Sequence, residues 1–335
     1  MVDQQTSRRI HERLTELYQR HLAADDSAVA NYYEATRGYY PPADAGEERD
    51  RFAICLASVD GELYCEGDHD RPFALQSISK VFVYSLALAD CGRDHVLRRV
   101  GVEPTGEAFN SILLNEHDRR PYNPMVNAGA IVAASMVRGR DTAEKVDRIV
   151  DVMRLFAGNE SLSVHQETFD REWAATDRNR AIAYLMRSYG MLTTDVEETL
   201  AVYLQQCSVM LSCDDLARMA ATLANGGVNP VTGVRPLPAL RVRDVLSVMF
   251  TCGMYDFAGE WVFDVGVPAQ SAVSGGILAA VPGKMGIRTI SPGLDPHGNS
   301  VRGVGVCREI SQRLGLHLFA GDDEDALLGP SAAHT

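Results

Sequence analysis

Strand-like and helix-like segments are segregated along this chain, and their order restricts the folds open to it. Two short apolar runs flank Asp60-Gly61, a dipeptide that favours a hairpin because both turn positions want positive φ. Residues 93–251 show mainly helical periodicity, and short strand-like runs return after Trp261. Strands at both ends with helices between them predict an α+β fold with an antiparallel sheet, rather than a succession of βαβ units.

Individual elements follow from the same patterns. Helices are expected at 7–23, 77–91, 143–156, 180–187, 194–210, 214–224 and 307–314. Strands are expected at 52–59, 62–66, 266–269, 275–282, 285–292 and 299–306. The sheet would close by bringing the terminal strands together around the helical insert. The helix that begins near Ser77 would then lie at the junction of the two parts, a common place for a site.

Composition excludes several classes of function. The chain has 335 residues, of which 46% are hydrophobic, and a net charge of −13, so a nucleic-acid partner is not expected. The apolar runs at 81–89 and 128–137 are too short to span a bilayer, and the N-terminal residues do not resemble a secretory signal. A cytoplasmic protein without a membrane partner is predicted. The seven cysteines are scattered without Cys-x-x-Cys spacing, which predicts buried reduced thiols and neither a disulfide nor a zinc site.

The most specific short motif is Ser77-Ile78-Ser79-Lys80 at the start of an apolar helix. Residues three apart lie on one helix face, so Ser77 and Lys80 would stand side by side. A desolvated lysine loses its proton readily and can then accept the proton of the serine hydroxyl. Ser-x-x-Lys is a nucleophile motif of penicillin-recognising enzymes, although a match by chance is expected in a chain of this length.

Two polar clusters in the helical part are open to two interpretations. Asn127 could present its amide to a substrate, or Asn123 and Asn127 could simply cap the helix that follows. Glu172 and the polar run up to Asn179 could bind the two charges of an amino acid, or could form a solvated helix entry with local ion pairs. From the residues alone, capping and local pairing are the stronger interpretations.

Two further segments lie near the C-terminal strands. Tyr255, between glycines, could expose a hydroxyl for proton transfer, or could be a core tyrosine whose hydroxyl is hydrogen-bonded. The small residues of 270–276 could let backbone N–H groups approach a ligand, or could form a strand edge with a glycine bulge. Phosphate-binding glycine loops, dinucleotide fingerprints and His-Glu-x-x-His spacing are not found in the sequence, so no cofactor and no metal are expected.

Taken together, five motifs in this order resemble the serine-dependent glutaminases, the bacterial and mitochondrial glutamine amidohydrolases. The similarity extends from about residue 29 to about residue 318. The motifs are Gln76-Ser-Ile-Ser-Lys-Val-Phe, Asn123-Pro-Met-Val-Asn-Ala-Gly-Ala-Ile, Asp177-Arg-Asn, Leu223-Ala-Asn-Gly-Gly and Cys252-Gly-Met-Tyr-Asp-Phe-Ala-Gly. The resemblance implies a β-lactamase-like α+β fold and hydrolysis of L-glutamine to L-glutamate and ammonia, with no cofactor.

The resemblance also implies a domain division. It places a glutaminase catalytic domain in 29–320. The N-terminal helix that periodicity predicts lies before it, in 1–28, and the acidic residues 321–335 after it are predicted to be a disordered tail. Within the catalytic domain, the sheet part takes about 29–92 and 252–320, and the helical part takes about 93–251. Relatives form dimers and tetramers, so a homo-oligomer is expected.

Residue roles carried over from the family are as follows. Ser77 is implied as the nucleophile and Lys80 as its base, Tyr255 as the tyrosine that relays protons, and Tyr32 as the tyrosine that closes over the pocket. The residues implied to hold the glutamine are Gln76, Asn127, Glu172, Asn179 and Tyr203, while Val273 is implied to supply a backbone N–H to the oxyanion hole.

Three departures from the family pattern stand out. Tyr32 is followed by Tyr33 rather than by isoleucine, and the residues before Asp177 differ from the usual ones. Gln270 and Ala272 replace the lysine and glycine that the family carries before its oxyanion residue. The changes at Gln270 and Ala272 keep open a non-catalytic glutamine-binding protein on the same fold. The other alternative is a β-lactamase or peptidase-type serine hydrolase, against which the lack of a lysine at 270 counts, because that lysine would bind a penicillin carboxylate.

Overall fold

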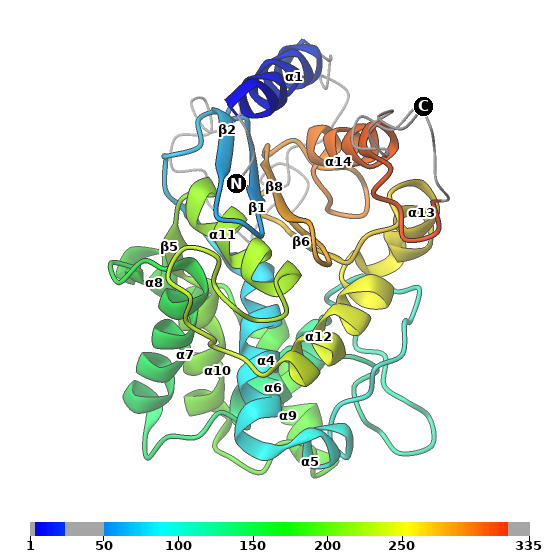
Figure 1. Cartoon of the computed structure of the whole chain (residues 1–335). Helices are drawn as coiled ribbons and strands as arrows, with labels where there is room; N and C mark the ends of the chain where they lie inside the picture. Colours follow the sequence, from blue (N-terminus) through cyan, green and yellow to red (C-terminus); the bar gives the residue numbers. More distant parts are fainter. Residues whose placement is uncertain (1–3, 24–49, 321–335) are drawn as a thin grey trace.

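A five-stranded antiparallel sheet joins the two ends of the chain (Figure 1). The structure, a computed structural model, describes residues 4–23 and 50–320. The strand order is β2-β1-β8-β7-β6, so strands from the N-terminal third lie directly beside strands from the C-terminal quarter. The strands are β1 (Ala53–Ser58), β2 (Leu63–Gly67), β6 (Ala269–Ala272), β7 (Gly276–Val281) and β8 (Met285–Ile290). The predicted antiparallel sheet built from both ends is confirmed.

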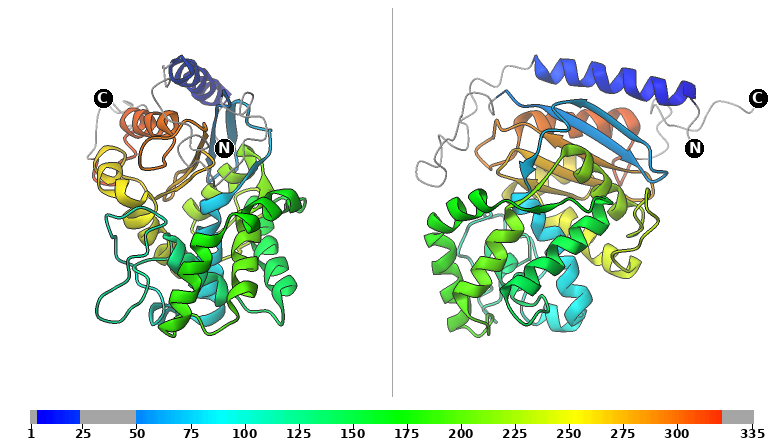
Figure 2. Two further views of the ribbon diagram at one scale, coloured as in Figure 1. Left: turned by 180° about the vertical axis from the view of Figure 1, so that it is seen from behind. Right: turned by 90° about the vertical axis from the view of Figure 1, so that its left-hand side faces the viewer.

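Alternation along the strands divides the apolar core into two clusters, one on each side of the sheet. Ala53 and Cys55 of β1 belong to one cluster, whereas Ile54 and Leu56 belong to the other, because successive side chains point to opposite faces. Helix α11 (Cys213–Ala224) packs on the first face. Helices α1 (Gln4–Leu22) and α14 (Val301–Leu314) lie side by side over the second face (Figure 2). Both faces are thus covered by helices.

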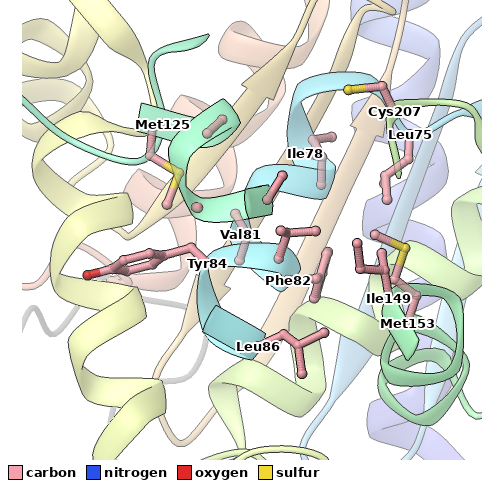
Figure 3. Close-up of a cluster of buried hydrophobic side chains, with 14 of the residues drawn as sticks. Leu75, Ile78, Val81, Phe82, Tyr84, Leu86, Met125, Ile149, Met153 and Cys207 are labelled. Atoms are coloured by element: carbon pink, nitrogen blue, oxygen red, sulfur yellow. The ribbon is translucent and has the colours of Figure 1, made fainter. Parts of the chain in front are cut away.

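The helical part is built around α4 (Ser79–Cys91), which is buried along most of its length. Helices α6 (Asn127–Ser135), α7 (Thr142–Ala157) and α12 (Ala239–Cys252) pack against it. Figure 3 shows the apolar side chains that gather about this helix from several elements. Because α4 is surrounded, any polar group at its N-terminal end is held at a fixed depth between the sheet and the helices.

The remaining elements complete the helical part and the connections to the sheet. They are α5 (Arg93–Leu97), α8 (Gln166–Ala174), α9 (Asp177–Ser188), α10 (Val196–Cys207), α13 (Ala258–Asp264), η1 (Gln76–Ile78), η2 (Tyr255–Phe257), β3 (Phe73–Ala74), β4 (Ser163–Val164) and β5 (Val209–Leu211). Strands β3, β5 and β4 form a second, small antiparallel sheet. No helix within the described residues has the length and apolar character needed to cross a membrane.

The predicted strand at 299–306 is wrong, because residues 301–306 form the first turns of α14. The valines there favour a strand locally. Ser300, however, caps the helix by accepting a hydrogen bond from the N–H of Gly303. Val304 and Cys307 then face the second core cluster at helical spacing. Tertiary burial therefore overrides local propensity in this segment.

Three other predicted elements need correction. The strand expected at 266–269 is displaced along the chain, because β6 spans Ala269–Ala272. The helix expected at 194–210 ends at Cys207, and Val209–Leu211 forms β5 instead. The hairpin at Asp60-Gly61 is confirmed, but of the two turn residues only Gly61 has a positive φ. The sequence signal located the turn correctly without giving its backbone geometry.

The expectation that all cysteines are reduced is wrong for Cys55 and Cys65, which form a disulfide. The two residues are direct partners in the β1–β2 ladder, with their Cα atoms 4.2 Å apart. Neighbouring strands thus bring the two sulfur atoms together. The other cysteines are free, as predicted: Cys91, Cys207, Cys213, Cys252 and Cys307.

Candidate active site

Ser77 and Lys80 lie where η1 runs into α4, at the junction of the sheet and the helical part. Strand β6 packs against η1 from one side and α10 packs against it from the other. The side-chain positions are nearly closed to solvent, with Ser77 8% exposed and Lys80 1% exposed. The predicted nucleophile and base thus lie three residues apart in the sequence at this junction, and both are nearly buried.

Backbone strain is concentrated at this junction. Three non-glycine residues in the described ranges have a positive φ, namely Gln76, Arg119 and Tyr255. A positive φ is unfavourable for a residue with a Cβ atom, and such residues cluster at functional sites. Gln76 directly precedes the candidate nucleophile, and Tyr255 is the predicted proton relay. The fold thus holds both flanks of the candidate site in a strained conformation.

The amine of Lys80 is poised to act as a base. Burial lowers its pKa to about 7, since desolvation disfavours the charged form. Its Nζ donates hydrogen bonds to the backbone oxygen of Met125 and to Oδ1 of Asn127, both at 2.8 Å. A neutral amine has two N–H groups and one lone pair. Because the two acceptors occupy both N–H groups, the lone pair remains available for a proton from another donor.

Tyr255 lies next to this amine. Lys80 Nζ is 5.5 Å from the centroid of the tyrosine ring. The Tyr255 hydroxyl donates to the backbone oxygen of Ser271 at 3.1 Å and accepts from Nε2 of Gln270 at 2.9 Å. Its position is therefore set by β6, the strand that packs on η1. Lys80 makes its two hydrogen bonds to Met125 and Asn127 and none to Ser77 Oγ. Catalytic hydrogen bonds are often long or unformed in sites without bound substrate.

Polar side chains of α6, α9 and α8 form hydrogen bonds that extend outward from Lys80 and η1. Asn127 Nδ2 donates to Asn179 Oδ1 at 3.0 Å, and Asn179 Nδ2 donates to Thr176 Oγ1 at 3.0 Å. On the other side, Gln76 Nε2 donates to Glu172 Oε1 at 2.9 Å. Asn127 does not act as the helix cap considered from the sequence. Instead, Asn127 links the candidate base to α9, and Gln76 links the nucleophile segment to α8.

Asn123 does not cap α6 either, because its side chain bonds to residues that precede the helix. Its Oδ1 accepts from the N–H groups of Met125 and Val126, at 3.0 and 3.2 Å. Val126 occupies the N-cap position of α6, and no side chain makes a capping hydrogen bond there. The turn before α6 is fixed by Asn123, which leaves Asn127 free to reach Lys80.

Tyr203 of α10 belongs to the same neighbourhood. Burial raises the pKa of its hydroxyl well above the usual value, with further contributions from Cys207, Tyr255 and Glu172. Tyr203 thus stays a neutral phenol that can donate or accept a hydrogen bond. Val273, at the turn between β6 and β7, is nearly buried. Tyr32 lies outside the described residues.

Sequence reasoning missed two parts of this site. The backbone oxygen of Met125 binds the Lys80 amine, and a carbonyl has no signature in a sequence. Gln270 positions the Tyr255 hydroxyl, although the sequence marked it only as the loss of a family lysine. The pairing of Gln270 with Tyr255 follows from the strand register and was not visible in the local pattern.

Comparison with known proteins identifies the family. The glutaminase family model matches residues 37–319. The chain belongs to the glutaminase family. A glutaminase of Trichormus variabilis is 52% identical over 306 residues, covering 91% of this chain and 89% of the relative. A glutaminase of Clostridium tetani is 43% identical over 84% of this chain and 92% of the relative.

Solved structures of glutaminases agree with this assignment. A structure described as a probable glutaminase superposes with a TM-score of 0.86 and 38% identity, covering 96% of this chain and 100% of that one. A crystal structure titled Mglu in its glutamate form gives a TM-score of 0.84 and 44% identity, covering 94% of this chain and 71% of that one. The resemblance inferred from the five motifs is confirmed at the level of the family.

Potential metal ligands gather away from the glutaminase site. In the parts of the chain that the structure describes, a group able to hold an ion consists of Cys55, Cys65, His69 and Asp214. These residues come from the β1–β2 hairpin, the loop after it and the first turn of α11. No residue of the candidate active site belongs to this group.

Proposed function

We propose that the chain hydrolyses L-glutamine to L-glutamate and ammonia through an acyl-enzyme on Ser77. Membership in the glutaminase family supplies the reaction. In the proposed first step, Ser77 Oγ attacks the side-chain amide carbon and transfers its proton to the base. The C–N bond then breaks, and ammonia leaves with a proton returned by the base. Water cleaves the γ-glutamyl ester in the second step and restores the serine hydroxyl.

The observation that carries this mechanism is the bonding of Lys80. Its pKa of about 7 leaves a large neutral fraction near neutral pH. Its two N–H groups are taken by Met125 and Asn127, so the lone pair is the part of the amine that can receive the Ser77 proton. A base whose pKa lies near the working pH transfers protons most effectively. This arrangement supports Lys80 as the general base.

Tyr255 and the backbone complete the proposed machinery. Tyr255, held by Gln270 and Ser271, relays protons between Lys80 and the leaving ammonia. The N–H groups of Ser77 and Val273 stabilise the oxyanion of the tetrahedral intermediate. Losing one donor of this kind costs about two to three powers of ten in rate. The packing of β6 on η1 supports this pairing of backbone segments.

Glutamine would be recognised by the polar groups around this centre. Glu172 meets the α-ammonium group, because a half-buried carboxylate is its natural partner. Gln76, Asn127, Asn179 and Tyr203 bind the α-carboxylate and the side-chain amide, and Tyr32 covers the pocket. One of the similar solved structures is described as Mglu in its glutamate form, which supports an amino-acid pocket of this kind.

The decisive test replaces the nucleophile and keeps its surroundings. Ser77→Ala should abolish ammonia release from L-glutamine while leaving the circular dichroism spectrum unchanged. Ser79→Ala is the matched control, since Ser79 lies in the same turn but faces Cys207 and Gln206. It should retain most of the activity. Substantial turnover by Ser77→Ala would remove Ser77 from its role.

A second measurement addresses the covalent intermediate. Hydroxylamine added during turnover should yield γ-glutamyl hydroxamate, because it competes with water for the ester. If glutamine disappears without any hydroxamate, direct attack by water is favoured over an acyl-enzyme. Glutamine binding without ammonia release would instead favour a binding protein, the alternative that the replacements at Gln270 and Ala272 leave open.

The finer architecture is part of the same proposal. We infer a β-lactamase-like arrangement, with a sheet part at about 29–92 and 252–320 and a helical part at about 93–251. The sheet closed by both chain ends and the burial of α4 between the parts support this division. A homo-oligomer and a cytoplasmic location stay predictions from the sequence. Light scattering coupled to size-exclusion chromatography tests the former.

A further inference from the structure

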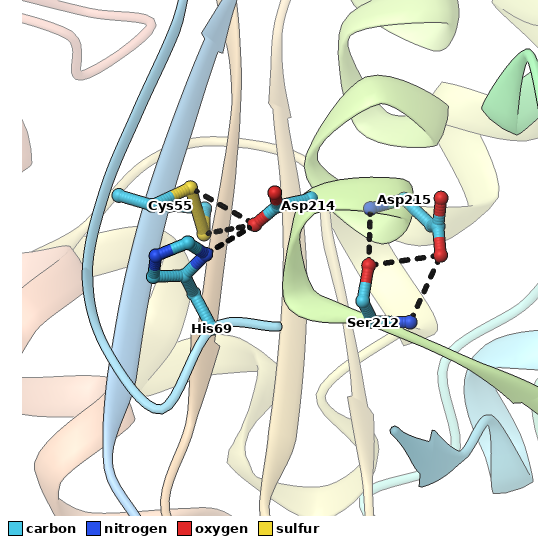
Figure 4. The surroundings of a disulfide bond; sticks show 6 residues. Cys55, His69, Ser212, Asp214 and Asp215 are labelled. Atoms are coloured by element: carbon cyan, nitrogen blue, oxygen red, sulfur yellow. Dashed lines mark hydrogen bonds and ion pairs between the residues drawn. A yellow bond between two sulfur atoms is a disulfide. The ribbon is translucent and has the colours of Figure 1, made fainter. Parts of the chain in front are cut away.

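Two sulfur atoms, an imidazole and a carboxylate converge beside the edge of the sheet (Figure 4). Asp214 Oδ1 lies 3.6 Å from Cys55 Sγ, 3.3 Å from Cys65 Sγ and 2.8 Å from His69 Nδ1. All four ligand atoms lie within 4.8 Å of one another. The family function makes no use of them, so their convergence calls for a separate explanation.

The disulfide alone does not account for the position of the carboxylate. A sulfur atom in a disulfide has no proton to donate, so both sulfurs present only lone pairs to Asp214 Oδ1. The contact with His69 stabilises one side of the carboxylate, whereas the contacts with sulfur add nothing. With the sulfurs as thiolates, three negative groups and an imidazole would surround one point. Such a set is stabilised by a cation at its centre.

We propose that the protein with reduced Cys55 and Cys65 binds a zinc ion through both thiolates, His69 Nδ1 and Asp214. Thiolate and imidazole ligands select zinc over calcium or magnesium, which prefer oxygen ligands. Four protein ligands make a closed site, the type that stabilises structure rather than catalysing a reaction. The proposal is independent of the glutaminase mechanism.

Zinc geometry fits these positions with small adjustments. Bonds of about 2.3 Å to sulfur and 2.1 Å to oxygen place those atoms about 3.6 Å apart in a tetrahedron. The observed distances of 3.6 and 3.3 Å from Asp214 Oδ1 to the two sulfurs are close to that value. The imidazole nitrogen and the carboxylate oxygen must separate by about 0.6 Å from their present 2.8 Å. The two sulfurs move apart by side-chain rotation once the S–S bond is broken.

The backbone holds the ligand-bearing segments in place. The N–H of Cys213 donates to the backbone oxygen of His69 at 2.8 Å, which ties the loop after β2 to the start of α11. Ser212 and Asp215 form a capping box that fixes the first turn of α11 (Figure 4). Because Asp215 serves the cap, Asp214 is left to face the sulfurs. The side chains of His69 and Asp214 are 36% and 25% exposed, which gives an ion a path of entry.

The oxidised and reduced forms differ in what they can bind. A phosphine reductant takes oxygen from water as the S–S bond breaks, and each sulfur gains a hydrogen to form a thiol. Zinc binding then releases the two thiol protons. The disulfide form lacks the thiolates and therefore binds zinc poorly. Reducing conditions, as in the predicted cytoplasmic location, favour the zinc-binding form.

The first experiment measures binding to the full chain. Protein reduced with a phosphine and freed of metal is titrated with zinc in competition with a chromophoric chelator. About one zinc per chain should bind to the reduced protein, and much less to the oxidised protein. Cobalt(II) should give thiolate-to-metal charge-transfer absorption and the intense visible bands of a tetrahedral site. Equal zinc binding by both forms, or a cobalt spectrum without thiolate absorption, would overturn the proposal.

Variants assign the ligands. Asp214→Asn and Cys65→Ser should each weaken zinc binding by more than the roughly 10- to 100-fold that loss of an outer-shell partner costs. His21→Gln removes another histidine–carboxylate pair, and Cys91→Ser removes a partly exposed thiol outside the cluster. Both controls should bind zinc as the parent protein does. Unchanged affinity in Asp214→Asn and Cys65→Ser would place the ion elsewhere and refute the assignment.

Thermal unfolding gives a readout that does not depend on the spectra. Zinc bound only by the native state should raise the Tm of the reduced protein, by an amount that grows with zinc concentration. The rise should vanish in Cys65→Ser and persist in Cys91→Ser. A Tm that does not respond to zinc in the reduced parent protein, while the chain is folded by circular dichroism, would contradict a closed structural site.

Discussion

Replacing Asn127 by aspartate tests whether the neutral amine of Lys80 is the catalytic base. Asn127 Oδ1 already lies 2.8 Å from Lys80 Nζ, so Asn127→Asp adds a negative charge with almost no change of shape. The carboxylate stabilises the ammonium form and should raise the pKa of Lys80. Activity that depends on the neutral amine must then move to higher pH.

The magnitude follows from the geometry. At 2.8 Å and an effective dielectric constant of about 20, the two charges attract by about 6 kcal/mol. Burying the new carboxylate costs part of this energy, and opposite charges at such distances typically change a pKa by about one to three. The pKa of Lys80 should rise from about 7 to between about 8 and 10. At pH 7 the neutral fraction, and with it the rate, should fall by roughly 5- to 500-fold.

The assay is the pH dependence of kcat/KM for L-glutamine, since its acid limb reports the base in the free enzyme. The parent enzyme should lose activity as the pH falls through about 7, where Lys80 becomes protonated. In Asn127→Asp this limb should move to higher pH, and the rate should recover in alkaline solution. Asn179→Asp places the same charge one hydrogen bond further away and should move the limb less.

Three results would refute this reasoning. An acid limb in the parent enzyme far from neutrality would mean that Lys80 is not the titrating base. A rate in Asn127→Asp that is low at every pH would indicate lost positioning rather than a raised pKa. An equal displacement of the limb in Asn179→Asp would mean that the charge acts through the general field of the site and not through contact with Lys80.

The other predictions concern stability. Gly129→Ala should lower the free energy of unfolding by about 1–3 kcal/mol and reduce activity, because its Cβ would meet the backbone of Asn123. Gly259→Ala, whose Cβ meets nothing within 4 Å in a helix, should instead stabilise by about 0.5–1 kcal/mol. The hydrogen bond with Asp256 raises the pKa of His297, so this pair stabilises the fold below about pH 6.5 and loses its effect as the pH rises through the raised pKa. His297→Gln should remove the contribution of this pair to the pH dependence of the urea concentration at which half of the protein is unfolded. An unchanged pH dependence in His297→Gln would contradict this prediction.

Local patterns predicted the features that depend on near neighbours. The i,i+3 spacing of Ser77 and Lys80 predicted a nucleophile and its base, and Asp60-Gly61 located the hairpin. The position of this hairpin also predicts that Cys55 and Cys65 are paired. Cys55 and Cys65 lie five residues on either side of Asp60, so a turn centred there places them opposite each other. Cys-x-x-Cys spacing reports only cysteines that are close in sequence, whereas this pair is joined across the β1–β2 ladder.

Features that depend on distant contacts were not predictable from the sequence. The valines before Cys307 favour a strand locally, and only their packing against the sheet makes them helical. Asp214 approaches Cys55 only because α11 packs on β1, more than a hundred residues earlier in the chain. No spacing rule anticipates such a cluster, since its members share neither a helix face nor a strand.

The properties of Lys80, the candidate base, depend both on its local motif and on contacts with distant parts of the chain. The motif predicts which residue is the base, but a lysine one turn after a serine would be an ordinary cation in water. Its pKa falls because α4 is buried on all sides, and its lone pair is freed because Met125 accepts one N–H. Met125 is held by Asn123, whose backbone comes so close to α6 that only glycine fits at residue 129. The close approach at Gly129 thus helps to position the carbonyl that binds Lys80, a side chain on another helix.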